Sequence, residues 1–246
     1  MSEIDGSVLQ LRDVVCRFGG LTAIDGVSLD FHPRQLYAII GPNGAGKTTL
    51  FNLISGAVRP TAGRITFEGK DITKLNVHEV ARLGIVRKFQ VPRVFATMTV
   101  LENLELPALA ARERESEREA RTRAREILEI VGLTGDEDEM ADSLSHGQKQ
   151  SLEIGMALMA KPTLLLLDEP AAGMDLEDTR RAVDLIHELA RTTTTIVIEH
   201  DMEFVRDLRS QVIVLHEGRV LRRGSMAEIE QDHVVRDVYL GRTSDA

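Results

Sequence analysis

Eight consecutive residues in the first third of the chain constrain its fold more than any other part of the sequence. They match the pattern G-x-x-x-x-G-K-T, which is typical of a phosphate-binding loop. The segment consists of Gly41, Pro42, Asn43, Gly44, Ala45, Gly46, Lys47 and Thr48. The apolar run Leu36–Ile40 predicts a strand directly before it, and residues 48–56 predict a helix after it. Strand, glycine loop and helix in this order predict an α/β fold.

The residue types in this segment suit a bound chain of phosphates. Glycines have no Cβ, so several backbone N–H groups can converge on phosphate oxygens. The helix that follows adds the positive end of its dipole. We expect Lys47 to neutralise the β and γ phosphates and Thr48 to hold Mg²⁺ through its hydroxyl, with Thr49 as a neighbouring candidate. The segment therefore predicts a site for a nucleotide and its Mg²⁺ ion.

Two acidic residues follow a second apolar run. Residues 164–167 are all leucine, which fits a buried strand of a parallel sheet, and Asp168 and Glu169 come directly after them. Ligands of α/β proteins bind at the carboxyl ends of such strands. Asp168 can therefore organise Mg²⁺ and its waters, and Glu169 can polarise an attacking water as a general base. The alternative is a solvated acidic turn.

A third candidate site is the segment Leu144-Ser145-His146-Gly147-Gln148, which precedes a predicted helix. A serine hydroxyl and a glycine N–H at the start of a helix can bind an anion. The alternative is that Ser145 only caps the helix, which is the simpler interpretation of this segment taken by itself.

Length and composition favour one α/β domain over residues 1–246 with a helical insertion. The stretch 107–132 is rich in Arg, Glu and Ala, with apolar residues at helical spacing.

The formal net charge of −9 disfavours a broad nucleic-acid-binding surface. The N-terminus lacks the features of a signal peptide, and no apolar run approaches the roughly 18 residues that span a bilayer. Any membrane role is therefore expected to be peripheral, through a partner.

In this order the three motifs resemble the nucleotide-binding subunits of ABC transporters, and the resemblance extends over nearly the whole chain. The segment with Ser145 is similar to that family's signature, usually LSGGQ, although His146 stands in its glycine pair here. The resemblance implies an α/β fold of the P-loop NTPase class with the ABC-ATPase core. That core has a mixed sheet, an N-terminal antiparallel β part and an inserted α-helical subdomain, here at about 91–160.

The resemblance also assigns residues outside these motifs. Gln90 corresponds to the glutamine that senses Mg²⁺ and the membrane partner, and His200 to a histidine that reaches the γ-phosphate. Asp175 lies in the loop that joins two active sites, and Phe18 matches the aromatic residue that stacks on adenine. Without the resemblance a structural role would be expected for His200, and a place in the core remains the alternative for Phe18.

The site implied by the resemblance has three groups of residues. Glu169 and His200 are expected to be catalytic. Mg²⁺ is expected on Thr48, Gln90 and Asp168. The residues expected to contact ATP are Phe18, Gly41, Asn43, Gly44, Ala45, Gly46, Lys47, Thr48, Thr49, Gln90, Ser145, Gly147, Gln148 and Asp175.

The family arrangement places two such domains head to tail, so that Ser145 and Gly147 of one complete the ATP site on the other. There is a physical reason for this, because phosphoryl transfer needs charge stabilisation from several directions, which one loop cannot supply. The resemblance implies transmembrane permease subunits, a second identical or related ATPase subunit and, indirectly, a periplasmic substrate-binding protein as partners. It places the chain at the cytoplasmic face of the membrane.

Several short strings are similar to importers of branched-chain amino acids, urea and short amides. The histidine in the signature and the Leu-His-Glu-Gly turn at 215–218 favour the urea-type member, whereas Asp175 follows the general family pattern. The strings are residues 87–90, 144–150, 172–174, 214–218 and 239–241. The main alternative is the ATPase subunit of an exporter of similar size. A non-transport ATPase of this family that acts on DNA is disfavoured by the single cysteine and the modest insertion.

Overall fold

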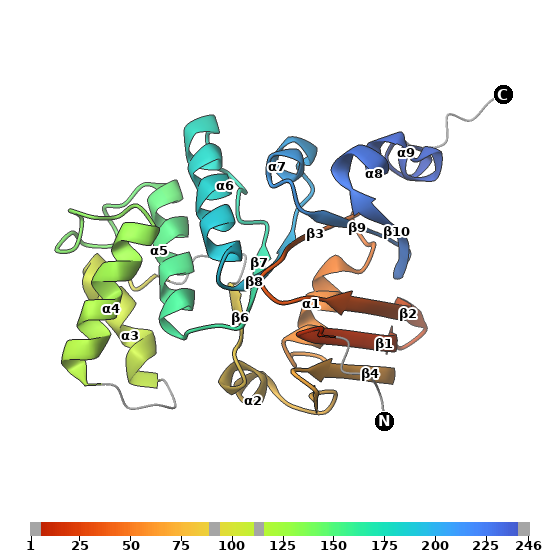
Figure 1. Ribbon diagram of the computed structural model, residues 1–246, viewed down its shortest axis with the longest axis horizontal. Coiled ribbons are helices and arrows are strands. Elements are labelled where there is room, and N and C mark those ends of the chain that lie inside the picture. Colours follow the sequence, from red (N-terminus) through yellow and green to blue (C-terminus); the bar gives the residue numbers. More distant parts are fainter. Residues whose placement is uncertain (1–5, 89–93, 111–115, 241–246) are drawn as a thin grey trace.

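Two β-sheets with helices around them make up the structure, a computed structural model that describes residues 6–88, 94–110 and 116–240 (Figure 1). The smaller sheet is antiparallel throughout. Its strands, in spatial order, are β2 (Leu21–Phe31), β1 (Leu9–Phe18), β4 (Ala62–Phe67) and β5 (Lys70–Asp71). Buried and exposed positions are interspersed along β1, as expected of a sheet with one face in the core. The predicted N-terminal antiparallel part is confirmed.

The larger sheet is mixed, as predicted. Only β10 runs antiparallel to its neighbour among the described strand pairs of this sheet. The spatial order is β10 (Arg219–Ser225), β9 (Gln211–His216), β3 (Leu36–Ile40), β8 (Thr194–Ile198), β7 (Leu164–Asp168) and β6 (Ile85–Lys88). Strands β7 and β8 are buried at every position. Because parallel strands end at the same edge, the segments after β3, β7 and β8 lie at one edge of this sheet.

The first helix, α1 (Lys47–Ile54), lies between the two sheets (Figure 1). Its Leu50, Phe51 and Ile54 are fully buried in a hydrophobic cluster that takes residues from both sheets. Each such side chain contributes about 1.5–3 kcal/mol through burial. This packing holds the start of α1 against the end of β3.

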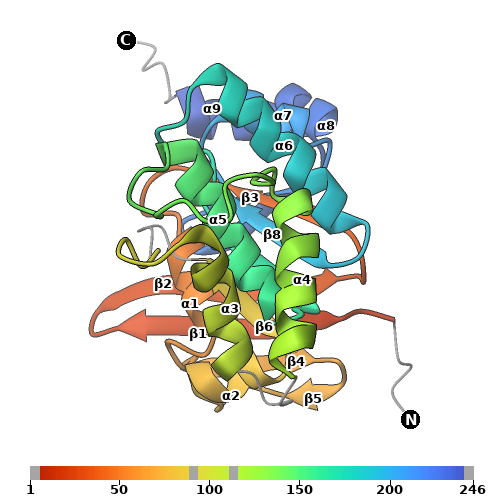
Figure 2. The ribbon, with the colours of Figure 1, turned by 90° about the vertical axis from the view of Figure 1, so that its left-hand side faces the viewer.

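A second hydrophobic cluster joins a group of helices to the larger sheet. Figure 2 shows this group in front of the strands, and Figure 1 shows it on the side away from the small sheet. The helices are α3 (Val100–Ala110), α4 (Glu117–Ile130), α5 (His146–Met159) and α6 (Leu176–Ala190). Helices α3 to α5 fall within the predicted subdomain, whose limits at about 91–160 remain a prediction.

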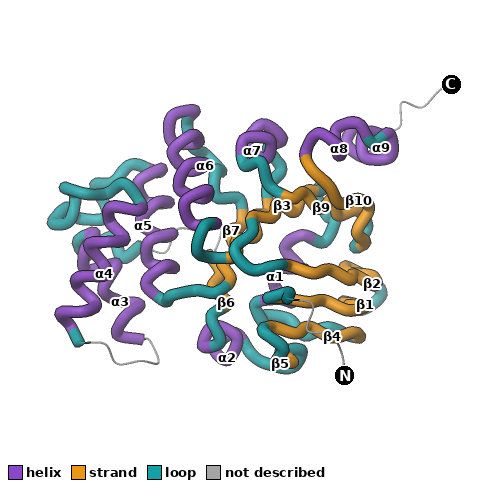
Figure 3. Tube along the Cα trace, in the orientation of Figure 1, coloured by secondary structure: helices purple, strands orange, loops and turns teal. Residues whose placement is uncertain are grey.

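Four short helices complete the described fold, drawn in purple in Figure 3. They are α2 (Val77–Arg82), α7 (Met202–Asp207), α8 (Met226–Gln231) and α9 (His233–Leu240). The last three contribute Val205, Met226, Ile229 and Val235 to a third hydrophobic cluster with β3 and β9. They therefore cover the face of β3 and β9 that α1 leaves open.

Some elements were not predicted. Strand β6 was missed because two of its four residues, Arg87 and Lys88, are cations. Helix α3 begins at Val100, well before the predicted stretch at 107–132, and it contains Pro107, which usually ends a helix. Helices α7 and α8, of six residues each, are too short for a periodic pattern. Within the described ranges, no helix combines the length and the apolar character needed to cross a membrane.

Candidate functional site

The glycine-rich loop joins β3 to α1 through backbone conformations that glycine adopts most easily. Gly41, Gly44 and Gly46 have φ angles of 155°, 81° and 104°. A Cβ on Gly41 would lie 2.2 Å from the carbonyl oxygen of Leu215, so this position has no room for a side chain. Helix α1, described over its whole length, has no side-chain cap and no acidic residue in its first turn. Its first N–H groups are therefore available to an anion.

The ammonium group of Lys47 lies inside this loop. Its Nζ donates to the carbonyl oxygens of Gly41 at 2.5 Å and Pro42 at 3.1 Å, and the residue is only 8% exposed. Burial lowers the pKa of Lys47, and the carboxylates of Glu169 and Asp168 raise it in part. The structure thus brings the loop cation near both acidic residues that follow β7.

Asp168 ends β7 and pairs with an arginine from the neighbouring strand β6. The Nη2 atom of Arg87 lies 2.7 Å from Oδ2 of Asp168, and both side chains are buried. Nη1 of Arg87 donates to Oδ1 of Asn52 at 2.6 Å, and the guanidinium lies 5.6 Å from the centroid of the Phe51 ring. One side chain therefore connects β6, β7 and α1 beside the glycine loop.

Glu169 has a left-handed backbone conformation, with φ at 47°. In a residue other than glycine such a conformation costs about 1–3 kcal/mol and is concentrated at functional sites. Oε1 of Glu169 lies 3.5 Å from Nδ1 of His200, which follows β8. The same imidazole nitrogen lies 3.8 Å from Oε2 of the buried Glu199. The two residues predicted to be catalytic are therefore adjacent.

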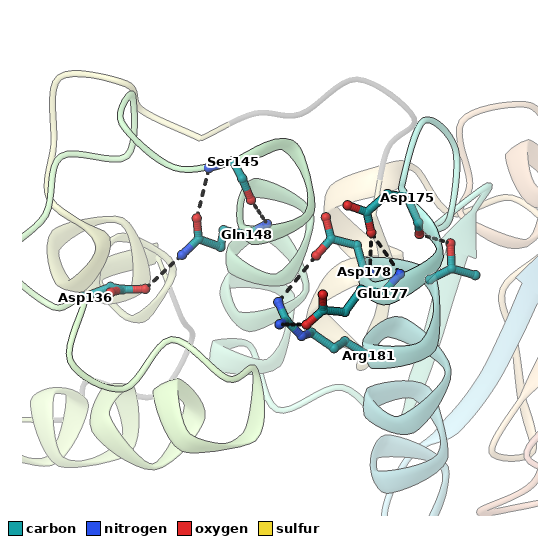
Figure 4. A network of polar contacts seen from close by, with 8 residues as sticks. Asp136, Ser145, Gln148, Asp175, Glu177, Asp178 and Arg181 are labelled. Carbon is teal, nitrogen blue, oxygen red and sulfur yellow. Dashed lines mark hydrogen bonds and ion pairs between the residues drawn. The ribbon is translucent and has the colours of Figure 1, made fainter.

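Ser145 caps helix α5, as the simpler interpretation of its segment predicted. Its Oγ accepts a hydrogen bond from the N–H of Gln148 at 3.2 Å, and Oε1 of Gln148 accepts one from the N–H of Ser145 at 3.0 Å. Nε2 of Gln148 also donates to Oδ2 of Asp136 at 3.1 Å (Figure 4). The cap uses the serine oxygen as an acceptor, so the hydroxyl can still donate to an anion.

Asp175 caps helix α6, which lies beside the start of α5 (Figure 4). Its Oδ1 accepts from the N–H groups of Glu177 at 2.9 Å and Asp178 at 2.8 Å. A Cβ on Gly147 would lie 2.3 Å from Oδ2 of Asp178. Glycine at position 147 therefore allows the Asp178 carboxylate to lie against the first turn of α5.

Two further predicted site residues are Gln90 and Phe18. Gln90 lies outside the described residues. Phe18, at the end of β1, is 48% exposed, and Leu21 at the other side of the same turn is 67% exposed. The ring of Phe18 is therefore not part of the hydrophobic core and is accessible for stacking.

The anion-binding features are separated within the chain. The glycine loop leads into α1 between the sheets, whereas α5 lies beyond β6 and β7 (Figure 1). The helix that Ser145 and Gly147 begin is therefore separated by β6 and β7 from the helix that follows the glycine loop (Figure 1). Each feature contributes only part of a phosphate site.

Comparison with known proteins decides the family. The family model described as ABC transporter matches residues 24–172. The chain belongs to the ABC transporter family. It is 38% identical to BraF of Pseudomonas aeruginosa, a high-affinity branched-chain amino acid transport ATP-binding protein, over 95% of this chain and 98% of that protein. It is 36% identical to LivG of Escherichia coli K12, which has the same description, with the same coverage.

Solved ABC cassettes share the fold. The ADP conformation of MJ1267, an ATP-binding cassette of an ABC transporter, superposes with a TM-score of 0.86 at 33% identity and covers 96% of this chain and 99% of that one. A dimeric post-hydrolysis state of the cassette MJ0796 with ADP and Pi has a TM-score of 0.77 at 28% identity, over 89% and 98% of the two chains. This chain is accordingly an ATP-binding ABC ATPase, as the sequence resemblance predicted.

Two buried ion pairs of this ABC ATPase were not predicted as site features. Arg87 and Lys88 entered the sequence analysis only as part of a string. In the structure Nζ of Lys88 lies 3.6 Å from Oε2 of Glu153 in α5, and both side chains are buried. Burial lowers the pKa of Lys88, while Glu153 raises it in part. No local signal in the sequence indicates either pair, because Asp168 and Glu153 lie far from the two cations along the chain.

Proposed function

We propose that the chain binds Mg-ATP between its own glycine loop and the Ser145 segment of a second nucleotide-binding domain, and that hydrolysis drives the permease subunits of an importer. The separation of two incomplete anion-binding features in one chain carries the proposal. The loop at Lys47 can contact a phosphate from one side only. The start of α5 offers further hydrogen-bond donors at a different place on the same chain. In a head-to-tail pair, the glycine loop of one domain and the start of α5 of the other contact the same ATP molecule.

In this site Glu169 acts as the general base for the attacking water. His200, 3.5 Å from it, lies at the same sheet edge and is positioned to contact the γ-phosphate. Lys47 neutralises the β and γ phosphates. The proximity of the charges supports these roles, because the carboxylates of Glu169 and Asp168 lie near enough to raise the pKa of Lys47 in part.

The residues fit a magnesium ion that arrives with the nucleotide. No group of three or more His, Cys, Asp or Glu residues in the described part of the chain could hold a metal. The hydroxyl of Thr48, the carboxylate of Asp168 and the amide of Gln90 are oxygen donors, and Mg²⁺ usually takes one or two protein ligands together with phosphates and waters. When bound, the ion neutralises developing charge on the phosphates.

The remaining contacts follow the expected order along the nucleotide. Phe18 stacks on adenine, and its exposure supports this role. The loop contributes Gly41, Asn43, Gly44, Ala45, Gly46, Thr48 and Thr49. The second domain contributes Ser145, Gly147, Gln148 and Asp175.

We infer that the transporter is an importer of the branched-chain amino acid, urea and short amide class. BraF and LivG are described as branched-chain amino acid transport proteins, and the methionine import protein MetN of Rhizobium etli is 38% identical over 89% of this chain and 61% of that protein. These descriptions favour import over the exporter alternative. The urea-type assignment remains a prediction from the signature histidine. Permeases, a second ATPase subunit and a location at the cytoplasmic face of the membrane follow from this class.

Light scattering on the Glu169→Gln variant tests the shared site. Without hydrolysis, ATP contacts from both domains persist, so the variant should change from monomer to dimer when Mg-ATP is added. Adding Mg-ADP instead is the control, because ADP lacks the γ-phosphate that both domains contact. A variant that binds ATP and stays monomeric would contradict pairing between identical chains.

A further inference from the structure

A histidine in the signature segment contacts the loop that follows Glu169. Nε2 of His146, the first residue of α5, lies 3.0 Å from the carbonyl oxygen of Ala172. A carbonyl oxygen only accepts hydrogen bonds, so Nε2 carries the hydrogen when this contact forms. The amide nitrogen of Gln150 lies farther from the same atom, at 3.4 Å, and because it also only donates it is then not hydrogen-bonded to Nε2. A Cβ built on Gly173 would lie 3.4 Å from the same nitrogen, which shows how closely the ring packs on the loop.

The loop connects this contact to the catalytic carboxylate residue. The N–H of Ala172 donates to the carbonyl oxygen of Glu169 at 3.2 Å. The N–H of Glu169 in turn donates to the carbonyl oxygen of Ile198 at the end of β8. A short chain of hydrogen bonds therefore runs from His146 through Ala172 to Glu169, whose backbone is already in the left-handed region.

A second contact holds the same two segments together further along the loop. The carboxylate of Asp178, in the first turn of α6, lies so close to Gly147 that a side chain at position 147 would displace it. Asp175, which ends the loop, caps the same turn (Figure 4). The start of α5 therefore contacts the loop at Ala172 and the helix that follows the loop at Asp178.

We propose that His146 is a positioning residue that couples the two ATP sites of the assembled pair. This inference rests on the proposed function. In the head-to-tail pair, Ser145 and Gly147 contact the ATP on the second domain, whereas Glu169 serves the ATP on its own. The His146 hydrogen bond joins these two segments within one chain. When Ser145 and Gly147 contact the ATP of one site, His146 therefore holds in place the loop that orients Glu169 at the other ATP site.

Two variants of similar size separate the hydrogen bond from the bulk of the ring. His146→Leu removes the donor, and His146→Gln keeps an N–H near the position of Nε2. We expect His146→Leu to lower kcat for ATP hydrolysis about fivefold, the effect of one net hydrogen bond, while KM for ATP stays within about twofold. His146→Gln should restore kcat to within about twofold of the original chain. His146 is exposed, so both variants should fold, and His146→Leu should lower Tm by no more than about 2–4 °C, the effect of one hydrogen bond.

The outcome that overturns the inference is specific. An unchanged kcat in His146→Leu, or an equal loss in both variants, would contradict a role for the hydrogen bond. A rise in KM for ATP as large as the expected fall in kcat would contradict the inference and place His146 in ATP binding instead. Glu169→Gln in the otherwise unchanged chain must abolish hydrolysis in the same assay. If it does not, the proposed function fails, whatever the His146 variants do.

Discussion

Arg87 and Asp168 form a buried ion pair, with Nη2 and Oδ2 2.7 Å apart. The pair places the carboxylate that is proposed to organise Mg²⁺ in contact with β6, the strand that leads toward Gln90. The pair thus joins the end of β7 to the end of β6.

Replacing Arg87 with methionine should destabilise the protein strongly. The substitution leaves the buried Asp168 carboxylate without its cation, which typically costs about 3–5 kcal/mol. Urea unfolding measures the loss. Arg191→Met is the matched control, because its ion pair with Glu188 is solvent-exposed and should contribute less than about 1 kcal/mol. Equal stability of the two variants would contradict the energetic role of the Arg87 pair.

The pair of Lys88 and Glu153 connects β6 with α5 and should behave as a coupled unit. Lys88→Met alone should cost about 3–5 kcal/mol, since it leaves Glu153 buried without its cation. The double variant Lys88→Met/Glu153→Leu should recover most of this loss, because neither charge is then buried. Urea unfolding of both single variants and the double variant gives the coupling energy. Additive losses would contradict the pairing.

The lowered pKa of Lys88 predicts a dependence on pH. Burial lowers this pKa below the value of 10.5 that an unperturbed lysine has. Between the lowered pKa and 10.5 the unfolded chain binds more protons, so the free energy of unfolding rises with pH there. The difference in unfolding free energy between the original chain and the double variant should move in favour of the original chain as pH rises toward 10.5. A difference that is constant with pH would show that the pKa is not lowered.

Lys47→Ala should remove most of the affinity for ATP. The ammonium group is held in the loop by two carbonyl oxygens, and its charge-assisted bonds to phosphate are expected to contribute about 2 kcal/mol or more. Titration calorimetry with Mg-ATP measures the change. Lys74→Ala, at an exposed position away from the loop, should bind as the original chain does. Unchanged affinity in Lys47→Ala would refute the loop assignment.

Phe18→Ala should weaken nucleotide binding by about 1–3 kcal/mol, by analogy with bases stacked on aromatic side chains. Stability should change little, since Phe18 is 48% exposed. Leu21→Ala removes a neighbouring exposed apolar side chain without an aromatic face and serves as the control. Equal effects of the two substitutions on ATP affinity would place adenine elsewhere.

The sequence predicted best what depends on local geometry. The glycine loop was identified because the backbone at Gly41 and Gly46 requires residues without a side chain. Strand β7 was identified because four buried leucines form a continuous apolar run. The cap at Ser145 follows the same rule, since it satisfies an N–H group a few residues away. The similar cap at Asp175 was not predicted.

Contacts between distant segments could not be predicted. Arg87 and Lys88 look like exposed residues in the sequence, and only the arrangement of β6 beside β7 and α5 gives them buried partners. The contact of Gly147 with Asp178 depends in the same way on the packing of two helices. The His146 contact with Ala172 belongs to this class as well.

The rate of phosphate release by Glu169→Gln, measured beside its affinity for ATP, tests the central claim most directly. If Glu169 is the general base of an ABC ATPase, the variant should bind Mg-ATP as tightly as the original chain and hydrolyse it about 10²–10⁴ times more slowly. Hydrolysis at the original rate would contradict the assignment of this site.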